Sequence, residues 1–403
     1  MFFPFINKKK QGEVVLILDI GSGSVAGSFV KFNLDELPEI LYSKRKPIKF
    51  QKELKGERFK NEMLKSLDIV LSDLNKTGLN FLPNHSKKID EAYCSLSSPW
   101  FVSQTKTLKI KKEKEFQVTS AMLTLLLKKE EEDFENSNLS KINKESLSSV
   151  EVIERKIVDI KLNGYKSEKP FGKKVKEAEF SIFMSVSETE ILDLIEKALL
   201  KHFHINKLFF HSFTLISFSA IRDMYNRVVD FLMLDITGEV TDISLIKDGN
   251  ILKTMSFPIG KNTLLRFVSE ELKTSPEEAL SSIKLLYTKS VLLDKKENLR
   301  KSIHNQKMIW SKEFQKAVNS LGGEGIIPST VFFTADEDLS NFYSEAIKSD
   351  EFTKSILADR QFIISFINPA TLSSYVSFHN KYDRDAFLGI ESVFFDKVFE
   401  LDR

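Results

Sequence analysis

The sequence predicts an α/β fold of two similar domains that face a shared cleft. An unbroken apolar run lies inside a first strand at 13–20, and Asp19 stands near its end, before a turn of small residues at 21–24. A second largely apolar strand at 228–234 leads into the turn 235–238, which also begins with aspartate. Such runs are typical of strands buried on both faces of a sheet. The repeat of strand, aspartate and turn therefore indicates an internal duplication.

The first half of the chain is predicted to open with a hairpin, because only the short turn separates 13–20 from the next strand at 25–32. The Lys- and Glu-rich segment 111–148 is predicted to be a surface insertion with a solvated helix face. The remaining elements expected here are a helix at 59–74, strands at 150–162 and 178–186, and an amphipathic helix at 188–202.

The second half is predicted to repeat the hairpin and then to become mainly helical. Asp248-Gly249 is a strong hairpin signal between two apolar runs. The expected elements are strands at 228–234, 240–246, 251–257 and 331–334, and helices at 264–273, 276–287 and 339–347.

Composition excludes several classes of protein. The chain has 403 residues, 42% of them hydrophobic, which is enough for a packed core and for two or three domains of about 150 residues. A net charge of +2 argues against a nucleic-acid-binding protein. Cys94 is the only cysteine, so neither an intramolecular disulfide nor a multi-cysteine metal site can form. No apolar stretch reaches the roughly 20 residues that span a bilayer. We therefore expect a cytoplasmic protein, either free or peripheral at the inner face of the cell membrane.

The two aspartate-containing turns are the candidate site of chemistry. Small residues let backbone N–H groups approach phosphate oxygens, and a carboxylate can hold magnesium through water. Two such turns that face one another could clamp a polyphosphate from both sides. Each turn alone is also explained as a tight hairpin, but the duplicated pair favours a nucleotide cleft.

The motifs resemble those of the actin-like ATPase superfamily, which has a duplicated ribonuclease H-like fold, and within it the bacterial cell-division family FtsA. Residues 18–25 look like its first phosphate loop, residues 234–242 like its second, and residues 333–338 stand where its adenosine loop falls. The resemblance implies ATP and magnesium as cofactors, with Asp19 and Asp235 on the metal through water and no catalytic base that can be named. It also implies nucleotide contacts from Asp19, Gly21, Ser22, Gly23, Ser24, Asp235, Thr237, Gly238, Thr241, Asp242, Thr334 and Ala335.

Two further runs are similar to the segments that open and close the inserted SHS2-type subdomain of FtsA, namely 89–97 and 152–172, the latter with Lys169-Pro170-Phe171-Gly172. The sister family PilM, whose N-terminus is similar to 2–10 of this chain, lacks that closing run, so FtsA is preferred. The implied organisation is a tail at 1–12, a first actin-like domain at 13–87 and 173–227, an insert at 88–172, a second domain at 228–385 and a C-terminal helix at 386–403.

Departures from the family pattern are concentrated in the loops. Ser24 stands where FtsA members usually have a phosphate-binding lysine, and Thr237 and Glu239 replace two glycines of the second loop. In the third loop, Ala335 and Asp336 replace paired glycines. Side chains at glycine positions block close approach of the backbone to a nucleotide. We therefore expect weak ATP binding and slow or absent hydrolysis.

The function implied by the FtsA resemblance is that of a cytoskeletal adaptor, which links a tubulin-like division protein to the membrane and polymerises with itself. The alternative is a PilM-like protein of type IV pilus assembly that binds a short peptide of a membrane partner. An actin-fold kinase is a third class, but no motif for a catalytic acid or a sugar pocket is present.

Membrane contact is expected, if anywhere, at the chain ends. Phe387, Ile390, Phe394, Val398 and Leu401 share one helical face, but acidic residues outnumber basic ones around it, so a helix packed on its own domain is favoured. The N-terminal Phe2, Phe3, Phe5 and Ile6, followed by Lys8, Lys9 and Lys10, form a better interfacial segment. His202 and His204 lack a third ligand and are read as structural.

Overall fold

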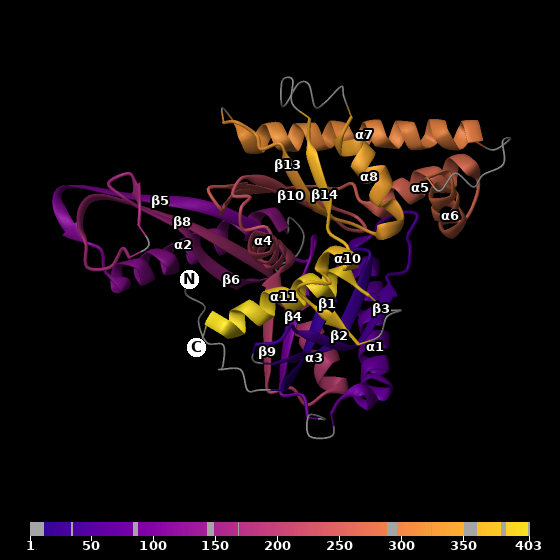
Figure 1. Cartoon of the computed structure of the whole chain (residues 1–403), viewed down its shortest axis with the longest axis horizontal. Coiled ribbons are helices and arrows are strands. Elements are labelled where there is room, and N and C mark those ends of the chain that lie inside the picture. Colours follow the sequence, from indigo (N-terminus) through magenta and orange to yellow (C-terminus); the bar gives the residue numbers. More distant parts are fainter. Residues whose placement is uncertain are drawn as a thin grey trace.

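Three β-sheets organise the chain in the computed structural model, which describes residues 12–33, 35–83, 88–142, 149–167, 169–287, 296–323, 325–349, 361–379 and 384–401. Figure 1 shows two of the sheets in a two-lobed body and the third extending to one side. The predicted interfacial segment at residues 2–10 lies outside the described residues.

The first domain is built on a six-stranded sheet of order β15-β3-β2-β1-β4-β9. Its strands are β1 (Glu13–Ile20), β2 (Ser24–Phe32), β3 (Glu39–Pro47), β4 (Glu91–Leu96), β9 (Lys207–Ser212) and β15 (Ser377–Phe378). β1 pairs antiparallel with β2 and parallel with β4, which confirms the predicted hairpin. Because β1 is central, its apolar run is buried on both faces.

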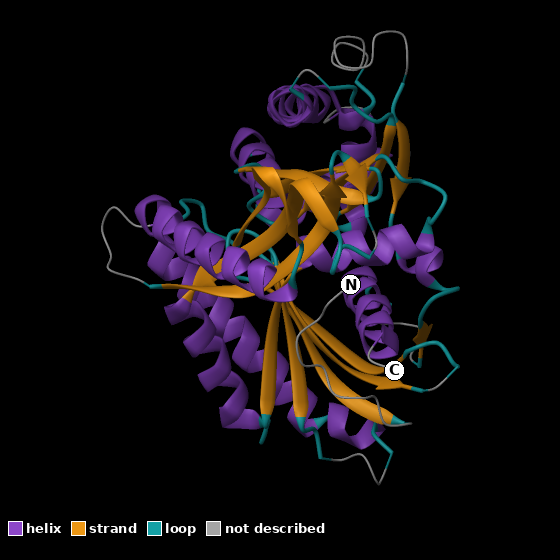
Figure 2. Cartoon of the chain, turned by 90° about the vertical axis from the view of Figure 1, so that its left-hand side faces the viewer, coloured by secondary structure: helices purple, strands orange, loops and turns teal. Residues whose placement is uncertain are grey.

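Helices cover both faces of this sheet (Figure 2). Leu16 and Leu18 of β1 share a core with α1 (Gly56–Lys76) and α3 (Thr189–His202), while Val15 and Ile17 share the opposite core with α4 (Phe213–Met224) and α11 (Ala386–Leu401). This alternation is the period of two that a strand imposes.

The second domain repeats the arrangement with a five-stranded sheet of order β12-β11-β10-β13-β14. Its strands are β10 (Phe231–Ile236), β11 (Thr241–Lys247), β12 (Asn250–Phe257), β13 (Thr330–Thr334) and β14 (Ile363–Phe366). β10 pairs antiparallel with β11 and parallel with β13, as β1 does with β2 and β4. The associated helices are α5 (Lys261–Leu272), α6 (Pro276–Tyr287), α7 (Lys296–Gly322) and α8 (Ser340–Ile347). The short helix α10 (Pro369–Leu372) follows β14 and packs against α11.

The insert is a four-stranded sheet of order β5-β8-β6-β7 with one long helix, and it projects from the body (Figure 1). It consists of β5 (Val102–Gln117), α2 (Ser120–Ile142), β6 (Val150–Leu162), β7 (Tyr165–Lys166) and β8 (Lys174–Glu188). The insert was predicted to span residues 88–172, but in the structure it extends from β5 to β8. β4 belongs to the six-stranded sheet, and β8 belongs to the insert because it pairs with both β5 and β6.

The C-terminal segment returns to the first domain, so the second domain ends before the predicted residue 385. β15 pairs with β3, and α11 packs beside α4 on the six-stranded sheet. Ile390, Phe394 and Val398 are buried in that core. The favoured interpretation of this segment, a helix packed on its own domain, is therefore confirmed, and this face of α11 cannot meet a membrane. In the described part of the chain, no helix is long and apolar enough to cross a bilayer.

Candidate functional site

A cavity of about 260 Å³ lies where the turns of the two domains meet. The first domain contributes the turn after β1, Arg45 of β3 and Ser97 after β4. The second contributes the turn after β10, Lys261 at the start of α5 and residues 335–337 after β13. Residues 384–387, at the start of α11, close one side. Of the predicted nucleotide contacts, seven line this cavity: Asp19, Gly21, Gly23, Ser24, Thr237, Gly238 and Ala335.

The two phosphate-loop candidates touch each other. The hydroxyl oxygens of Ser22 and Thr237 lie 2.7 Å apart, and the amide of Glu239 donates to the Ser22 hydroxyl at 2.9 Å. A Cβ placed on Gly238 would lie 2.5 Å from the Cα of Gly23, so the two glycines are in backbone contact. A glycine is required at 238 for this approach. The loops therefore meet directly, and no phosphate fits between their tips in this arrangement.

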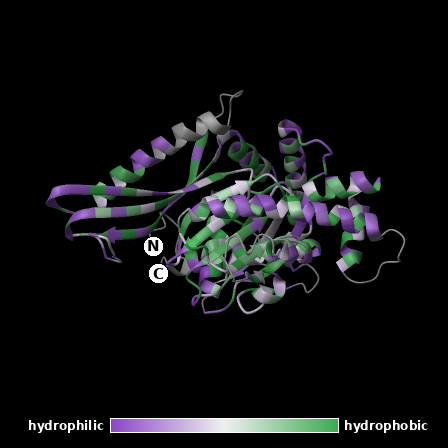
Figure 3. Cartoon of the chain, turned by 90° about the horizontal axis from the view of Figure 1, so that it is seen from above, coloured by the Kyte–Doolittle hydropathy of each residue, from purple (hydrophilic) through white to green (hydrophobic). Residues whose placement is uncertain are grey.

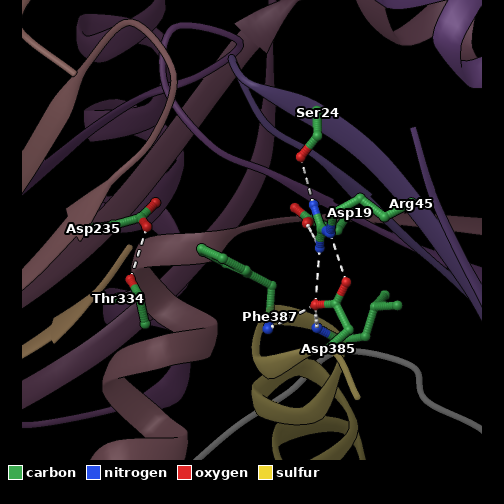
Figure 4. A network of polar contacts seen from close by, with 8 residues as sticks. Asp19, Ser24, Arg45, Asp235, Thr334, Asp385 and Phe387 are labelled. Atoms are coloured by element: carbon green, nitrogen blue, oxygen red, sulfur yellow. Dashed lines mark hydrogen bonds and ion pairs between the residues drawn. The ribbon is translucent and has the colours of Figure 1, made fainter. Parts of the chain in front are cut away.

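Arg45 is the central cation of the site, and it is held by three side chains (Figure 4). Its Nη2 donates to Asp19 at 2.7 Å, its Nη1 to Ser24 at 2.7 Å and its Nε to Asp385 at 2.6 Å. The guanidinium also lies 5.2 Å from the ring centre of Phe387. Since a guanidinium has five N–H donors, these contacts use much of its capacity for binding a phosphate.

Acidic groups crowd this part of the first domain. Burial raises the pKa of Asp19, which the charge of Arg45 opposes and that of Asp385 reinforces. Burial also holds the pKa of Glu391, a fully buried residue of α11, well above its usual range, and the negative charge of Asp19 adds to this effect. Both effects favour the neutral form of the Glu391 carboxyl group.

The third loop brings its acidic residues to the cavity as the sequence predicted. Asp336 forms an ion pair with Lys261, and its other carboxylate oxygen accepts from the amide of Asp338 at 3.1 Å. Lys261 is thus a cation at the cavity wall that already has an anionic partner. The backbone amides of Lys261 and Asn262, which open α5, donate to the carbonyls of Thr237 and Gly238 at 2.9 and 2.7 Å. This helix N-terminus is therefore occupied by the second loop rather than open to an anion.

Glu239 does not face the cavity, although the sequence suggested a carboxylate near phosphates. Its side chain is buried and forms an ion pair with Arg266 of α5, and Asn262 Nδ2 donates to it at 2.8 Å. The departure from glycine at this position therefore fastens the second loop to α5.

Five of the predicted contacts lie outside the cavity lining: Ser22, Asp235, Thr241, Asp242 and Thr334. Asp235 accepts from the Thr334 hydroxyl at 2.8 Å, and burial together with the charge of Asp242 holds the pKa of Asp235 well above its usual range. Thr241 donates to the Ile259 carbonyl at 2.6 Å and accepts from the indole of Trp310 at 3.2 Å. Thr241 and Thr334 therefore find partners within the protein, whereas Oδ2 of Asp235 is buried without a hydrogen-bond partner.

The residues present do not fit a magnesium–nucleotide complex. At Asp19 a guanidinium occupies the position of a cation, and Asp235 is buried in a setting that favours its neutral form. The cavity is also smaller than the roughly 300–1,000 Å³ of typical small-molecule sites. Among the described residues no group of three or more His, Cys, Asp or Glu side chains could hold a metal ion. His202 is bound to Asp68 at 2.8 Å, in keeping with a structural role.

A second cavity of about 230 Å³ lies between the insert and the second domain. It is lined by residues 98 and 101–103, by Thr214 of α4, by residues 242–244 of β11 and by residues 254–256 of β12. Ser98 donates to Asp242 at 2.8 Å, so the carboxylate has a partner at the cavity wall. β5 and β12 are edge strands of their sheets, and they approach at Ser103 and Thr254, whose hydroxyls lie 3.3 Å apart.

Solved structures of other proteins are similar to this chain. A structure described as a PilM–PilN type IV pilus biogenesis complex is similar, with 12% identity, a TM-score of 0.60, and coverage of 95% of this chain and 96% of that chain. The fold is that of the actin-like ATPases. A Bacteroides thetaiotaomicron protein with an actin-like ATPase fold and unknown function matches at 10% identity and a TM-score of 0.38, with coverage of 97% of this chain and 99% of that chain. The ethanolamine utilization protein EutJ of Carboxydothermus hydrogenoformans matches at 10% identity and a TM-score of 0.42, with coverage of 97% of this chain and 92% of that chain. No family model matches the sequence, and no curated protein matches it significantly.

Sequence reasoning missed three residues of the site: Arg45, Lys261 and Asp385. Arg45 lies in the segment Lys44-Arg45-Lys46. This segment has no strong apolar pattern, because β3 becomes more exposed to solvent toward its C-terminal end. Asp385 joins the site from 340 positions away along the chain. The nearest available signal was Ser24, which stands where FtsA members usually have a lysine. Its presence indicates that a basic residue from elsewhere in the chain lies at this turn.

Proposed function

We propose that this chain is an adaptor that uses the actin-like fold as a scaffold and binds a short peptide of a membrane-anchored partner. The observation that carries the proposal is the likeness to the PilM–PilN complex over nearly the whole of both chains, including the inserted sheet. At 12% identity this likeness concerns the fold, so the function rests on the geometry of the grooves and on experiment.

The state of the nucleotide cleft supports a role without nucleotide turnover. The loops are in contact at Gly23 and Gly238, and the cations Arg45 and Lys261 are neutralised by aspartates. A polyphosphate would have to displace these internal partners before it could bind. The cleft is therefore better suited to holding the two domains together than to catalysis.

The second cavity is the better candidate for a peptide. Its walls include the edge strands β5 and β12, which touch where the Thr254 hydroxyl donates to the Ser103 carbonyl at 3.3 Å. An extended peptide can pair with an exposed strand edge through its backbone. Val102 and Met255, which line it, present exposed apolar side chains, with exposed fractions of 38% and 37%. Apolar side chains beside a free strand edge are the features that edge-pairing peptide sites use for specificity.

The experiment is a fluorescence-anisotropy titration with a labelled peptide from a PilN-type membrane protein. We expect saturable binding in the micromolar range, at least tenfold weaker for Met255→Glu. It should be unchanged for the control Leu285→Glu on α6, whose residue is 44% exposed against 37% for Met255.

The division-ring alternative is tested in the same assay. The C-terminal tail of a tubulin homologue replaces the pilus-type peptide, and binding of that tail alone would favour the FtsA-like adaptor. Binding of neither peptide, or equal loss in both variants, would contradict the proposed peptide site.

A further inference from the structure

The outer end of the inserted sheet is rich in lysine. Residues 109–117 and 161–177, which we call the basic tip, hold ten lysines and four glutamates, a local charge of about +6 in a chain whose net charge is only +2. Figure 1 shows this end of the sheet extending to one side of the body, and hydrophilic residues predominate there in Figure 3. Lys166 within it donates to the Asp248 carbonyl of the second domain at 3.4 Å.

Part of this charge is balanced within the sheet. Lys109 lies 2.7 Å from Glu179, and Lys111 lies 3.8 Å from Glu177. Lys161 and Lys166 lie 3.9 and 4.0 Å from Asp159. Four further lysines gather around the turn that opens β8, and all are exposed: Lys169, Lys173, Lys174 and Lys176. The tip therefore keeps a positive surface after its internal pairs are taken into account.

Backbone contacts hold these lysines in place. Gly172, with a φ of +82°, donates to the Val118 carbonyl at 2.8 Å, and Val118 donates to the Lys173 carbonyl at 3.0 Å. The side chain of Asn163 accepts from the amides of residues 176 and 177 at 3.1 and 3.0 Å. The turn is thus a fixed platform, so little ordering entropy is lost when it docks.

Aromatic side chains stand among the lysines. Phe171, at the summit of the same turn, is 42% exposed although the adjacent Pro170 is buried, and Tyr165 on β7 is 79% exposed. Exposing a large apolar side chain is unfavourable in water, and it is favourable where lysines bind phosphate headgroups and the ring enters the interface below them.

We propose that the basic tip docks on an anionic lipid surface, with its lysines on the headgroups and Phe171 in the interfacial layer. A lipid surface suits this site better than an acidic peptide does, because the lysines and the ring lie on a projecting turn rather than in a groove. The second cavity lies at the other end of the insert, where β5 begins, and none of its lining residues belongs to the basic tip.

The test is co-sedimentation of the full chain with vesicles. Vesicles of phosphatidylcholine with about 30% phosphatidylglycerol are compared with phosphatidylcholine alone. We expect at least tenfold stronger partition to the anionic vesicles, which weakens as salt is raised because the Debye length shrinks. The triple variant Lys169→Gln, Lys173→Gln, Lys174→Gln should reduce partition about a hundredfold. Phe171→Ser should reduce it about fivefold.

The matched control is Lys301→Gln, Lys312→Gln, Lys316→Gln on α7, which removes the same charge from exposed positions elsewhere. It should retain most of the binding, and thermal melts should show all variants folded. Equal partition of the tip and control variants would overturn the proposal, as would binding to polyglutamate without binding to anionic vesicles. Peptide binding in the anisotropy assay should be unaffected by the tip substitutions, so the failure of one proposal is distinguishable from the failure of the other.

Discussion

The two hairpin turns of the duplicated domains have the same topology and different chemistry. In the first domain, Asp19 lines the cavity and is held by Arg45, a cation that comes from β3. In the second, Asp235 lies outside the cavity lining, accepts from Thr334, and is held near its neutral form by burial and by Asp242. The same aspartate on the same strand end thus serves as a charged partner in one domain and as a buried polar group in the other. The side chains around the turn decide which role it has.

The largest effect is expected from Arg45→Met, which leaves Asp19 and Asp385 without their shared cation. Removing one partner of a buried ion pair typically costs 3–5 kcal/mol, and we expect about 3 kcal/mol here because the side chain of Arg45 is 28% exposed. Urea unfolding at pH 7.5 measures the loss. It should shrink at pH 4, where the carboxyl groups take up protons. Arg45→Lys, which keeps the charge, should be intermediate, and a loss below about 0.5 kcal/mol would contradict the role of Arg45.

Contact between the two turns is tested by Gly238→Ala. The new Cβ would lie 2.5 Å from the Cα of Gly23, so the turns must separate, at a cost of about 2 kcal/mol. The matched control is Gly56→Ala, where no atom lies within 4 Å of the new Cβ. Unfolding midpoints in urea should differ clearly between the two variants. Equal stability of both would mean that the turns do not touch.

Opposite signs are expected when each strand-end aspartate is replaced by asparagine. Asp235→Asn should stabilise the protein at pH 8 by about 1–2 kcal/mol, because the native carboxyl group has a raised pKa and its ionisation opposes folding. A raised native pKa makes stability fall as pH rises above the unfolded value near 4, so the gain should vanish toward that pH. Asp19→Asn should instead destabilise by about 1 kcal/mol, because Arg45 loses a charged partner. Burial raises the pKa of Asp19 as well, but the charge of Arg45 opposes that rise. Chemical unfolding between pH 4 and 8 compares them, and the same sign at pH 8 would remove the distinction between the two turns.

The smallest expected effect belongs to Ser22→Ala, which removes the hydroxyl that bridges Thr237 and the amide of Glu239. Loss of these buried contacts should cost about 1 kcal/mol. Ser24→Ala, which removes one of several contacts of Arg45, should cost less. Thermal unfolding with a small temperature step resolves the two, and the reverse order would show that the bridge is weak.

Much of the fold could be predicted because its signals are local. Apolar runs placed β1, β2 and β10 to β12 nearly at their ends, and the repeated aspartate turn revealed the duplication. The contacts that set the site's chemistry could not be predicted, since they join distant segments. Nothing near Arg45 in the sequence indicates that Asp385 is its partner. The turn away from the cleft by Glu239 could not be predicted either, because its partner Arg266 lies on another element, α5. The predicted boundaries of the insert were wrong for a related reason. A strand pattern at 178–186 identifies β8 but does not say which sheet it joins.

We propose that the cleft holds the two domains together instead of holding a nucleotide. The turns of the two domains touch, and the cations Arg45 and Lys261 are paired with aspartates of the chain itself. Isothermal titration of the full chain with ATP and magnesium tests this most directly. We predict no saturable binding below about 1 mM, which corresponds to less than roughly 4 kcal/mol of binding free energy. Micromolar affinity, or sustained release of phosphate from ATP, would contradict it.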